Sequence, residues 1–188
     1  MSDTEAGSDY DKAGKALLQS IIAGGGEVQN RAHLGAMVPI QLFQALRLIG
    51  LGSSIERMVG GGARALIYQS GARLGQVLGD LVLPRAGRDL GAYLGLVREV
   101  CLSLSIGQVS LEQQDSGHDR LTLRVDECVS CAGISGVVAP ICHFEAGLVG
   151  GLVKVFVRRD VRAVETRCNA VGDKTCAIDV TVLGGNGG

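Results

Sequence analysis

Four residues near the C-terminal end of the chain restrict its possible folds more than any others. Glu165, Cys168 and Cys176 lie within twelve residues of one another, and Cys142 precedes them in the same half of the chain. Three thiols and one carboxylate are a complete tetrahedral ligand set for a divalent ion of borderline softness, most often zinc. Four protein ligands leave no open position, so we expect such an ion to support structure rather than chemistry.

Two simpler interpretations of the cysteines stay open. Free cysteine is among the most frequently buried residue types, so these thiols can be inert core side chains. They can also pair as disulfides, but the stretch Met1–Glu5 lacks the basic and apolar regions of a secretory signal. Thiols inside the cell stay reduced, and clustered cysteines there bind metal more often than they pair. We therefore expect a cytoplasmic protein.

The same two segments resemble the 4-vinyl-reductase-type family of small-molecule-binding domains. The matching motifs are Cys-His-Phe-x-Ala-Gly at Cys142–Gly147 and Glu-x-x-Cys-x-x-x-Gly-Asp-x-x-Cys at Glu165–Cys176. The resemblance extends over about residues 36–182. In aromatic-sensing members of the family, zinc is held by ligands that match four residues of this chain in type and spacing: Cys142, Glu165, Cys168 and Cys176. The resemblance therefore implies a structural zinc.

Hydrophobic periodicity predicts helices in most of the chain. Apolar residues recur at three- and four-residue steps in four segments: 35–50, 55–82, 88–105 and 137–155. We expect an interruption at Gly60–Gly62, because each glycine weakens a helix by about 1 kcal/mol. Pro84 and Gly87 predict a turn, and Pro140 is expected in the first turn of the last helix.

Strand patterns occupy the remainder. Arg120–Val125 alternates strictly between polar and apolar residues, and Val109–Leu111 alternates before it, so the two predict an antiparallel hairpin. Arg162–Arg167 and Cys176–Val182 predict a second pair of strands. This order predicts an α+β fold with helices packed on one face of a four-stranded antiparallel sheet. The resemblance implies the fold shared by nitric-oxide-sensing and vesicle-tethering domains.

The length of 188 residues fits one domain with short tails. Residues 1–14 are polar and acidic and are expected to form a disordered tail, residues 15–183 the domain, and residues 184–188 a flexible tail. Within the domain, Lys15–Ala23 predicts a short helix that stops at Gly24-Gly25-Gly26. Its apolar edge needs a partner, such as a second subunit, and the resemblance also implies a homodimer.

Composition argues against several functions. The net charge of −1, scattered basic residues and absence of tryptophan exclude the usual nucleic-acid footprint. The segment 132–153 is long enough to span a bilayer, but Pro140 and Glu145 lie in its middle, so we expect no membrane span. No nucleophile with a paired base, phosphate loop or dinucleotide fingerprint occurs, which favours a protein that is not an enzyme.

The motif Cys128-Val129-Ser130-Cys131 is half of a zinc site, and no second CxxC completes it. No βαβ pattern surrounds it, which argues against a thioredoxin-like role. We rank inert or weakly redox-active thiols first, a secondary metal or cofactor site second and a disulfide third. Cys101 lies on an apolar stripe and is read as a core residue. His143 competes with Cys142 as a ligand but points about 100° away around a helix.

The resemblance also implies a cavity for a small hydrophobic ligand between the helices and the sheet. We predict a binding module for an aromatic, lipid-like or tetrapyrrole molecule, with zinc as structural support. The alternative is an accessory or carrier protein in bacteriochlorophyll or tetrapyrrole biosynthesis, in which the family's 4-vinyl reduction takes place. Five aromatic residues are candidate cavity walls, although they can equally be ordinary core: Phe43, Tyr68, Tyr93, Phe144 and Phe156.

Overall fold

The computed structural model describes residues 3–24, 37–117 and 119–184. Contacts divide the chain into two units, Met1–Pro39 and Ile40–Gly188. The first unit contains helix α1, Asp3–Ile22, which begins well before the expected start at Lys15. No proline interrupts this stretch, so the chain has no strong reason to delay the helix. Gly25 and Gly26 of the expected stop, and the last four residues of the expected C-terminal tail, lie outside the described residues.

The second unit begins with short helical segments that precede three longer helices, α4, α5 and α6. Its helical elements are α2 Ile40–Ala45, the π-helical η1 Leu46–Ser53, α3 Ser54–Val59, η2 Gly60–Gly62, α4 Ala63–Ala86, α5 Leu90–Ser103 and α6 His143–Val157. The predicted break at Gly60–Gly62 is confirmed. The predicted turn at Pro84 is wrong, because α4 continues through Pro84 and ends where Gly87 adopts a φ of 65°. Pro84 removes one hydrogen bond and crowds the carbonyl four residues before it, and the helix continues for only two residues beyond it.

Four strands form one antiparallel sheet. They are β1 Gln108–Gln114, β2 Arg120–Asp126, β3 Val161–Arg167 and β4 Cys176–Val182, in the spatial order β1-β2-β4-β3. Leu121, Leu123 and Val125 of β2 are buried, whereas Arg120 and Arg124, which alternate with them, are exposed, as the pattern predicts. The predicted α+β fold, with helices packed on a four-stranded antiparallel sheet, is confirmed.

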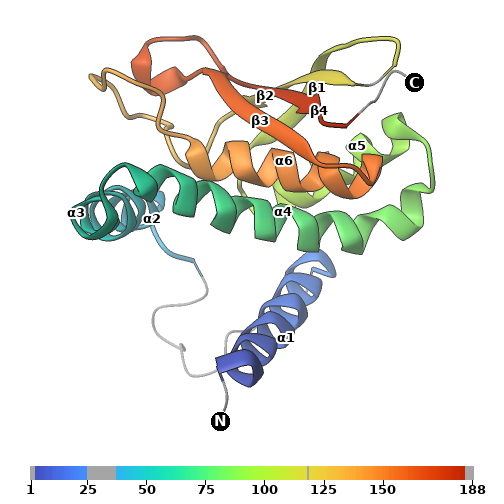
Figure 1. The fold of residues 1–188 in the computed structure, drawn as a ribbon, viewed down its shortest axis with the longest axis horizontal. Coiled ribbons are helices and arrows are strands. Elements are labelled where there is room, and N and C mark those ends of the chain that lie inside the picture. Colours follow the sequence, from blue (N-terminus) through green and yellow to red (C-terminus); the bar gives the residue numbers. More distant parts are fainter. Residues whose placement is uncertain (1–2, 25–36, 118, 185–188) are drawn as a thin grey trace. The chain divides into compact units, whose positions relative to one another are not determined.

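Helix α6 is the central element of the second unit. It packs on β3 and β4 through one face and on α4 through another, so that it lies between the sheet and α4 (Figure 1). Helix α5 packs against α4 and β1. Residues Glu145 to Val153 of α6 are all buried. The N-terminal end of α6 is therefore fixed from both sides, and this end carries Cys142.

Glycines allow α4 and α6 to approach backbone to backbone. A Cβ atom at Gly71 would lie 1.9 Å from the carbonyl oxygen of Phe144, and one at Gly147 would lie 2.0 Å from that of Tyr68. Gly75 and Gly151 face equally close backbone atoms. Only glycine fits such positions. These glycines therefore serve helix packing and fix the position of α6 relative to α4.

The apolar segment 132–153 is divided between a loop and α6. Pro140 lies in that loop and not, as predicted, in the first turn of the helix, which begins at His143. The carbonyl of Ile141 accepts a hydrogen bond from the Arg47 side chain, so it is satisfied outside a helix. Across the described ranges, we find no helix with the combined length and hydrophobicity that a bilayer crossing requires.

Candidate metal centre

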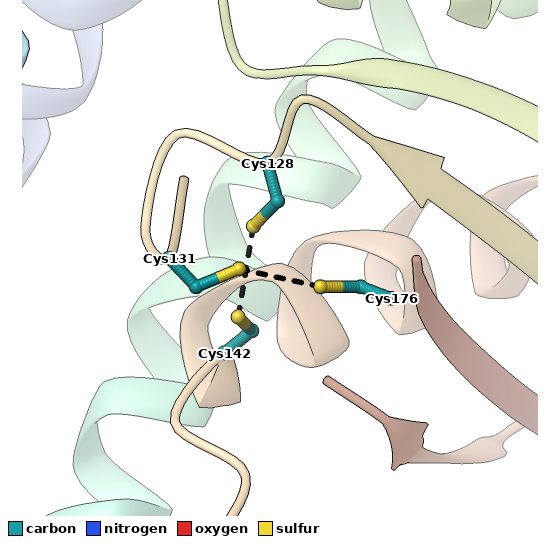
Figure 2. A group of neighbouring side chains, drawn as sticks. All are labelled: Cys128, Cys131, Cys142 and Cys176. Carbon is teal, nitrogen blue, oxygen red and sulfur yellow. Dashed lines mark hydrogen bonds between the residues drawn. The ribbon is translucent and has the colours of Figure 1, made fainter. Parts of the chain in front are cut away.

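Six potential metal ligands from separate parts of the second unit converge at one end of the sheet. Cys128 and Cys131 lie in the loop after β2, and Cys142 immediately precedes α6. Glu165 lies in β3, Cys168 follows that strand, and Cys176 is the first residue of β4. Figure 2 shows the sulfur atoms of four of these cysteines pointing toward one another.

Strand register accounts for this convergence. Val125, next to the end of β2, pairs with Cys176, so the CxxC loop emerges beside the start of β4. The β3–β4 pairing shifts register between Glu165 and Arg167, which marks a bulge just before Cys168. The loop between Cys168 and Cys176 is closed by the carboxylate of Asp173, which accepts a hydrogen bond from the Cys168 backbone N–H at 2.8 Å.

The four predicted ligands form one compact group. One ligand atom from each of Cys142, Glu165, Cys168 and Cys176 lies within 4.8 Å of the other three. The Sγ atoms of Cys142 and Cys168 are 3.8 Å apart. With Zn–S bonds near 2.3 Å, tetrahedral geometry requires sulfur–sulfur separations of about 3.8 Å. The group therefore has the ligand types and spacing of a metal site.

Glu165 supplies an independent indication that a cation belongs here. Its Oε2 atom accepts a hydrogen bond from the backbone N–H of Cys142 at 2.8 Å. Its Oε1 atom is buried and accepts no hydrogen bond, although the residue as a whole is half-buried. Burial raises the pKa of this carboxyl. An unpartnered buried carboxylate oxygen is costly, and a metal ion at this position would satisfy it.

A second group overlaps the first. Cys128, Cys131, Cys142 and Cys176 also have sulfur atoms within 4.8 Å of one another. The Sγ atoms of Cys128 and Cys142 are 3.6 Å apart, and those of Cys131 and Cys176 are 3.3 Å apart. All six cysteines of the chain are free thiols. Cys101 is buried in α5 and belongs to neither group, and His143 also lies outside both.

Hydrogen bonding among the thiols distributes the negative charge unevenly. Hydrogen bonds from the thiols of Cys128, Cys131 and Cys142 lower the pKa of Cys176. Hydrogen bonding to Cys131 raises the pKa of Cys128, and hydrogen bonding to Cys128 raises the pKa of Cys142. Burial raises the pKa of Cys168 to about 12. Hydrogen bonding to Cys128 lowers the pKa of Cys131. Metal binding would release the protons that remain on these thiols.

The CxxC loop is held from outside by two buried polar side chains of α2 and η1. Gln44 Nε2 donates to the carbonyls of Val129 at 3.1 Å and Ala132 at 3.0 Å. Arg47 donates to the carbonyl of Ser130 at 3.2 Å and to that of Ile141, which precedes Cys142, at 2.8 Å. These two side chains connect α2 and η1 to the CxxC loop and to the residue that precedes Cys142.

Ser130 and Glu145 complete this support. The Ser130 hydroxyl donates to Oε1 of Glu145, and both residues are almost fully buried. Our sequence reasoning did not identify the roles of Gln44, Arg47, Ser130 and Glu145. The usable signal was a charged residue inside an apolar helix, Glu145, because a buried carboxylate requires partners. Burial raises the pKa of the Glu145 carboxyl, and the Ser130 hydrogen bond and Arg47 charge oppose that effect.

A pocket of about 250 Å³ lies directly at the metal centre and is lined by Cys128, Cys131 and Cys176. Two larger cavities lie near the residues that precede and begin α6. One, of about 340 Å³, lies between η1, α3, α4 and the loop at 137–141; the other, of about 390 Å³, lies between α4, the start of α6 and β3. Arg64, Pro140 and His143 line both. Glu165 lines the second cavity, so a metal ligand forms part of its wall. Burial and the charges of Arg64 and Arg47 lower the pKa of His143, which favours its neutral form.

The five predicted aromatic residues lie in different surroundings. Tyr68 lines the second cavity. Tyr93 is buried in the core, where its hydroxyl donates to the carbonyl of Leu152 at 2.8 Å and its ring lies 5.0 Å from that of Phe156. Phe43 and Phe144 are half-buried and line neither cavity. The structure thus places one of the five, Tyr68, in the wall of a cavity that Glu165 also lines.

Comparison with known proteins connects this geometry to a family. The model of the vinyl-4-reductase domain family matches residues 121–182, which contain both ligand groups. An uncharacterised protein of Methanocaldococcus jannaschii, MJ0150, is 32% identical over 149 residues, which are 79% of each chain. This chain belongs to the vinyl-4-reductase domain family. Another uncharacterised protein of that organism, MJ1642, is 24% identical over 80% of this chain and 82% of its own.

Solved structures with the same fold have diverged far in sequence from this vinyl-4-reductase domain protein. The phenol-responsive sensory domain of the transcription activator PoxR, solved with phenol, has a TM-score of 0.63 at 16% identity and covers 77% of this chain and 75% of its own. A vinyl-4-reductase family protein from Methanocaldococcus jannaschii has a TM-score of 0.59 at 13% identity. The match covers 90% of this chain and 94% of that protein. A trafficking protein particle complex subunit 3 from Naegleria fowleri, covalently bound to palmitic acid, has a TM-score of 0.52 at 14% identity. The match covers 76% of this chain and 96% of that protein.

Proposed function

We propose that this vinyl-4-reductase domain protein is a binding module that encloses a small hydrophobic molecule, and that a zinc ion at Cys142, Glu165, Cys168 and Cys176 supports the binding site. The observation that carries the proposal is the contact between cavity and metal centre: Glu165 belongs to both. Zinc bound by these four residues would have no open position, so it would fix the wall without reacting.

The cavities favour a ligand of modest size. Their volumes of about 340 and 390 Å³ lie near the lower end of the range of roughly 300–1,000 Å³ found for ligand pockets. Ile67, Val137 and Ala139 supply apolar contacts, whereas Arg64 and His143 supply polar groups that can orient a hydroxyl or carboxylate. This combination fits a phenol or an acyl chain with one polar end. It fits a tetrapyrrole, and with it the carrier role in bacteriochlorophyll biosynthesis, less well.

Two structural relatives support the same ligand class. The PoxR domain was solved with phenol and the trafficking subunit with palmitic acid, and each of these ligands has one apolar body and one polar end. The chemistry needed to hold them matches the lining of the two cavities here. We extend this ligand class to the present chain as part of the proposal.

We further propose a cytoplasmic homodimer. Large apolar side chains of α2, η1 and α3 are exposed, among them Leu42, Leu46, Ile49 and Met58, with exposed fractions of 59%, 58%, 67% and 82%. An exposed apolar group of this kind marks a contact surface. Native mass spectrometry and sedimentation at several concentrations test the dimer. A monomer at all concentrations contradicts that part of the proposal.

A thermal-shift panel of phenols, fatty acids and porphyrins tests the binding function. A ligand that binds only the folded state raises the melting temperature, to a degree set by its concentration relative to Kd. The variant Ala139→Leu partly fills both cavities and should abolish the shift, whereas Ala92→Leu, on the exposed face of α5, should leave it intact. If no compound in the panel stabilises the wild-type protein, the binding module is refuted. A Soret band that follows added porphyrin would favour the carrier role instead.

A further inference from the structure

We propose that Cys128 and Cys131 hold a second divalent cation, which shares the thiolates of Cys142 and Cys176 with the zinc ion proposed above. The inference rests on that first ion and adds a site beyond it. Two overlapping groups of four ligands meet the distance requirement of a metal site, and they have Cys142 and Cys176 in common. The second cation would turn a mononuclear support into a binuclear centre.

The separations within the second group fit a tetrahedron of thiolates. Cys142 lies 3.6 Å from Cys128, and Cys176 lies 3.3 Å from Cys131, measured between sulfur atoms. These values are close to the separation of about 3.8 Å that a tetrahedral zinc–thiolate site requires. Figure 2 shows these four sulfurs converging from the CxxC loop, the start of α6 and the start of β4.

The arrangement of the ligands argues against one ion with spare thiols around it. The six ligand atoms do not form one group within 4.8 Å; they form two groups that overlap at Cys142 and Cys176. Cys128 and Cys131 belong only to one group, and Glu165 and Cys168 only to the other. This is the pattern of two tetrahedra that share one edge. Thiolate sulfur can occupy such a shared position because it has several lone pairs.

Charge also favours two cations over one. Five thiolates and one carboxylate carry six negative charges, and all of these side chains lead into a buried site. One divalent ion would leave four of these charges or require protons on the remaining thiols, whereas two ions leave two. Unpaired buried charge is strongly unfavourable. Binding of the second cation would release the protons of the Cys128 and Cys131 thiols to solvent and form two terminal metal–sulfur bonds.

The CxxC loop has the rigidity of a prepared site. The backbone N–H groups of Cys131 and Ala132 both donate to the carbonyl of Cys128, at 3.2 and 2.9 Å, which closes a tight turn around the two thiols. Gln44 and Arg47 hold the outside of the same turn. Metal sites depend on outer contacts of this kind to orient their ligands.

Metal content separates the two sites. Protein purified with zinc should contain two zinc ions per chain by native mass spectrometry and elemental analysis. The double variant Cys128→Ser/Cys131→Ser should contain one, and the matched control Cys101→Ser, a buried cysteine outside both groups, should contain two. One ion in both the wild type and the double variant overturns the second site and leaves the first intact. A wild type without zinc refutes both.

Cadmium NMR tests the binuclear centre without any substitution. Wild-type protein loaded with ¹¹³Cd should give two resonances of equal intensity, one from a four-sulfur site and one from a site with three sulfurs and one oxygen, coupled through the shared thiolates. A single resonance overturns the proposal. A brown protein with iron and acid-labile sulfide also overturns it, because the same thiolates would then hold an iron–sulfur cluster.

Discussion

The substitution Gly147→Ala tests the packing that positions Cys142. A Cβ atom at this position would lie 2.0 Å from the carbonyl oxygen of Tyr68, whereas real Cβ atoms essentially never approach closer than 3.0 Å. Helices α4 and α6 must therefore separate locally by at least the difference, about 1 Å. The obstacle is backbone, so no side-chain rotation can relieve the contact. A gap of 0.5–1 Å already removes about a quarter to a half of the dispersion attraction between facing atoms.

The expected change in the free energy of unfolding follows from two opposing effects. Overpacking a well-packed interface costs about 1–3 kcal/mol, and an immovable backbone places this site near 3 kcal/mol. Replacing glycine by alanine inside a helix stabilises the helix by about 1 kcal/mol at most. We expect Gly147→Ala to lower the free energy of unfolding by about 2 kcal/mol. In the control Gly95→Ala, in α5, the new Cβ meets no atom within 4 Å, so the substitution should stabilise the protein by about 0.5–1 kcal/mol.

Urea unfolding of the metal-loaded protein measures both effects. The two variants should differ by about 3 kcal/mol in extrapolated free energy at an unchanged m-value. If Gly147→Ala is as stable as Gly95→Ala, the backbone contact between α4 and α6 is not formed as described. Zinc affinity of the Gly147 variant should also fall, since Cys142 lies at the start of the displaced helix.

Three further predictions concern single side chains. Burial raises the pKa of the Cys101 thiol to about 12, so the protonated thiol contributes fully to stability below about pH 9 and loses that contribution as the pH rises toward 12. The free energy of unfolding should therefore fall with a slope of up to 1.36 kcal/mol per pH unit in this range. Cys101→Ala should remove that part of the slope, and an identical slope in the variant refutes the assignment. Arg47→Ala should cost about 2–4 kcal/mol because two buried carbonyls lose their donors, whereas Arg57→Ala, an exposed neighbour, should cost under about 0.5 kcal/mol in the same urea titrations. Glu165→Gln should weaken zinc binding at least tenfold in competition titrations with a chromophoric chelator, and an unchanged affinity excludes this carboxylate as a ligand.

Local sequence patterns predicted the elements well where one periodicity dominated. Strict alternation identified β2, and the terminal hairpin followed from the apolar face of Ile178, Val180 and Val182 and the Gly172-Asp173 turn before it. The boundary errors at Pro84 and Pro140 have one cause: proline restricts a helix, but its neighbours decide on which side the helix lies. Gly87 ended α4 instead, and the bond from Arg47 to Ile141 stabilised a loop before α6.

The proximity of the CxxC motif to the other ligands was beyond local patterns. It depends on the pairing of β2 with β4, which places Val125 beside Cys176 although the two residues are distant in sequence. If β1 rather than β2 paired with β4, the strands would show the same alternation of polar and apolar residues. The CxxC loop would then lie away from Cys176. Gln44 and Arg47 were missed for the same reason, since their partners lie more than eighty residues away.

The loop at 137–142 connects the two cavities to the metal centre, so a movement at one is expected to affect the other. Ala139 and Pro140 line both cavities, the Ile141 carbonyl is held by Arg47, and Cys142 belongs to both ligand groups. A molecule that displaces Pro140 must also displace Cys142, because only one residue separates them. Conversely, metal bound at Cys142 restricts the cavity wall before any ligand arrives, which lowers the entropy that ligand binding has to overcome. If the proposed metal and ligand both bind, a metal without an open position would therefore still influence ligand affinity.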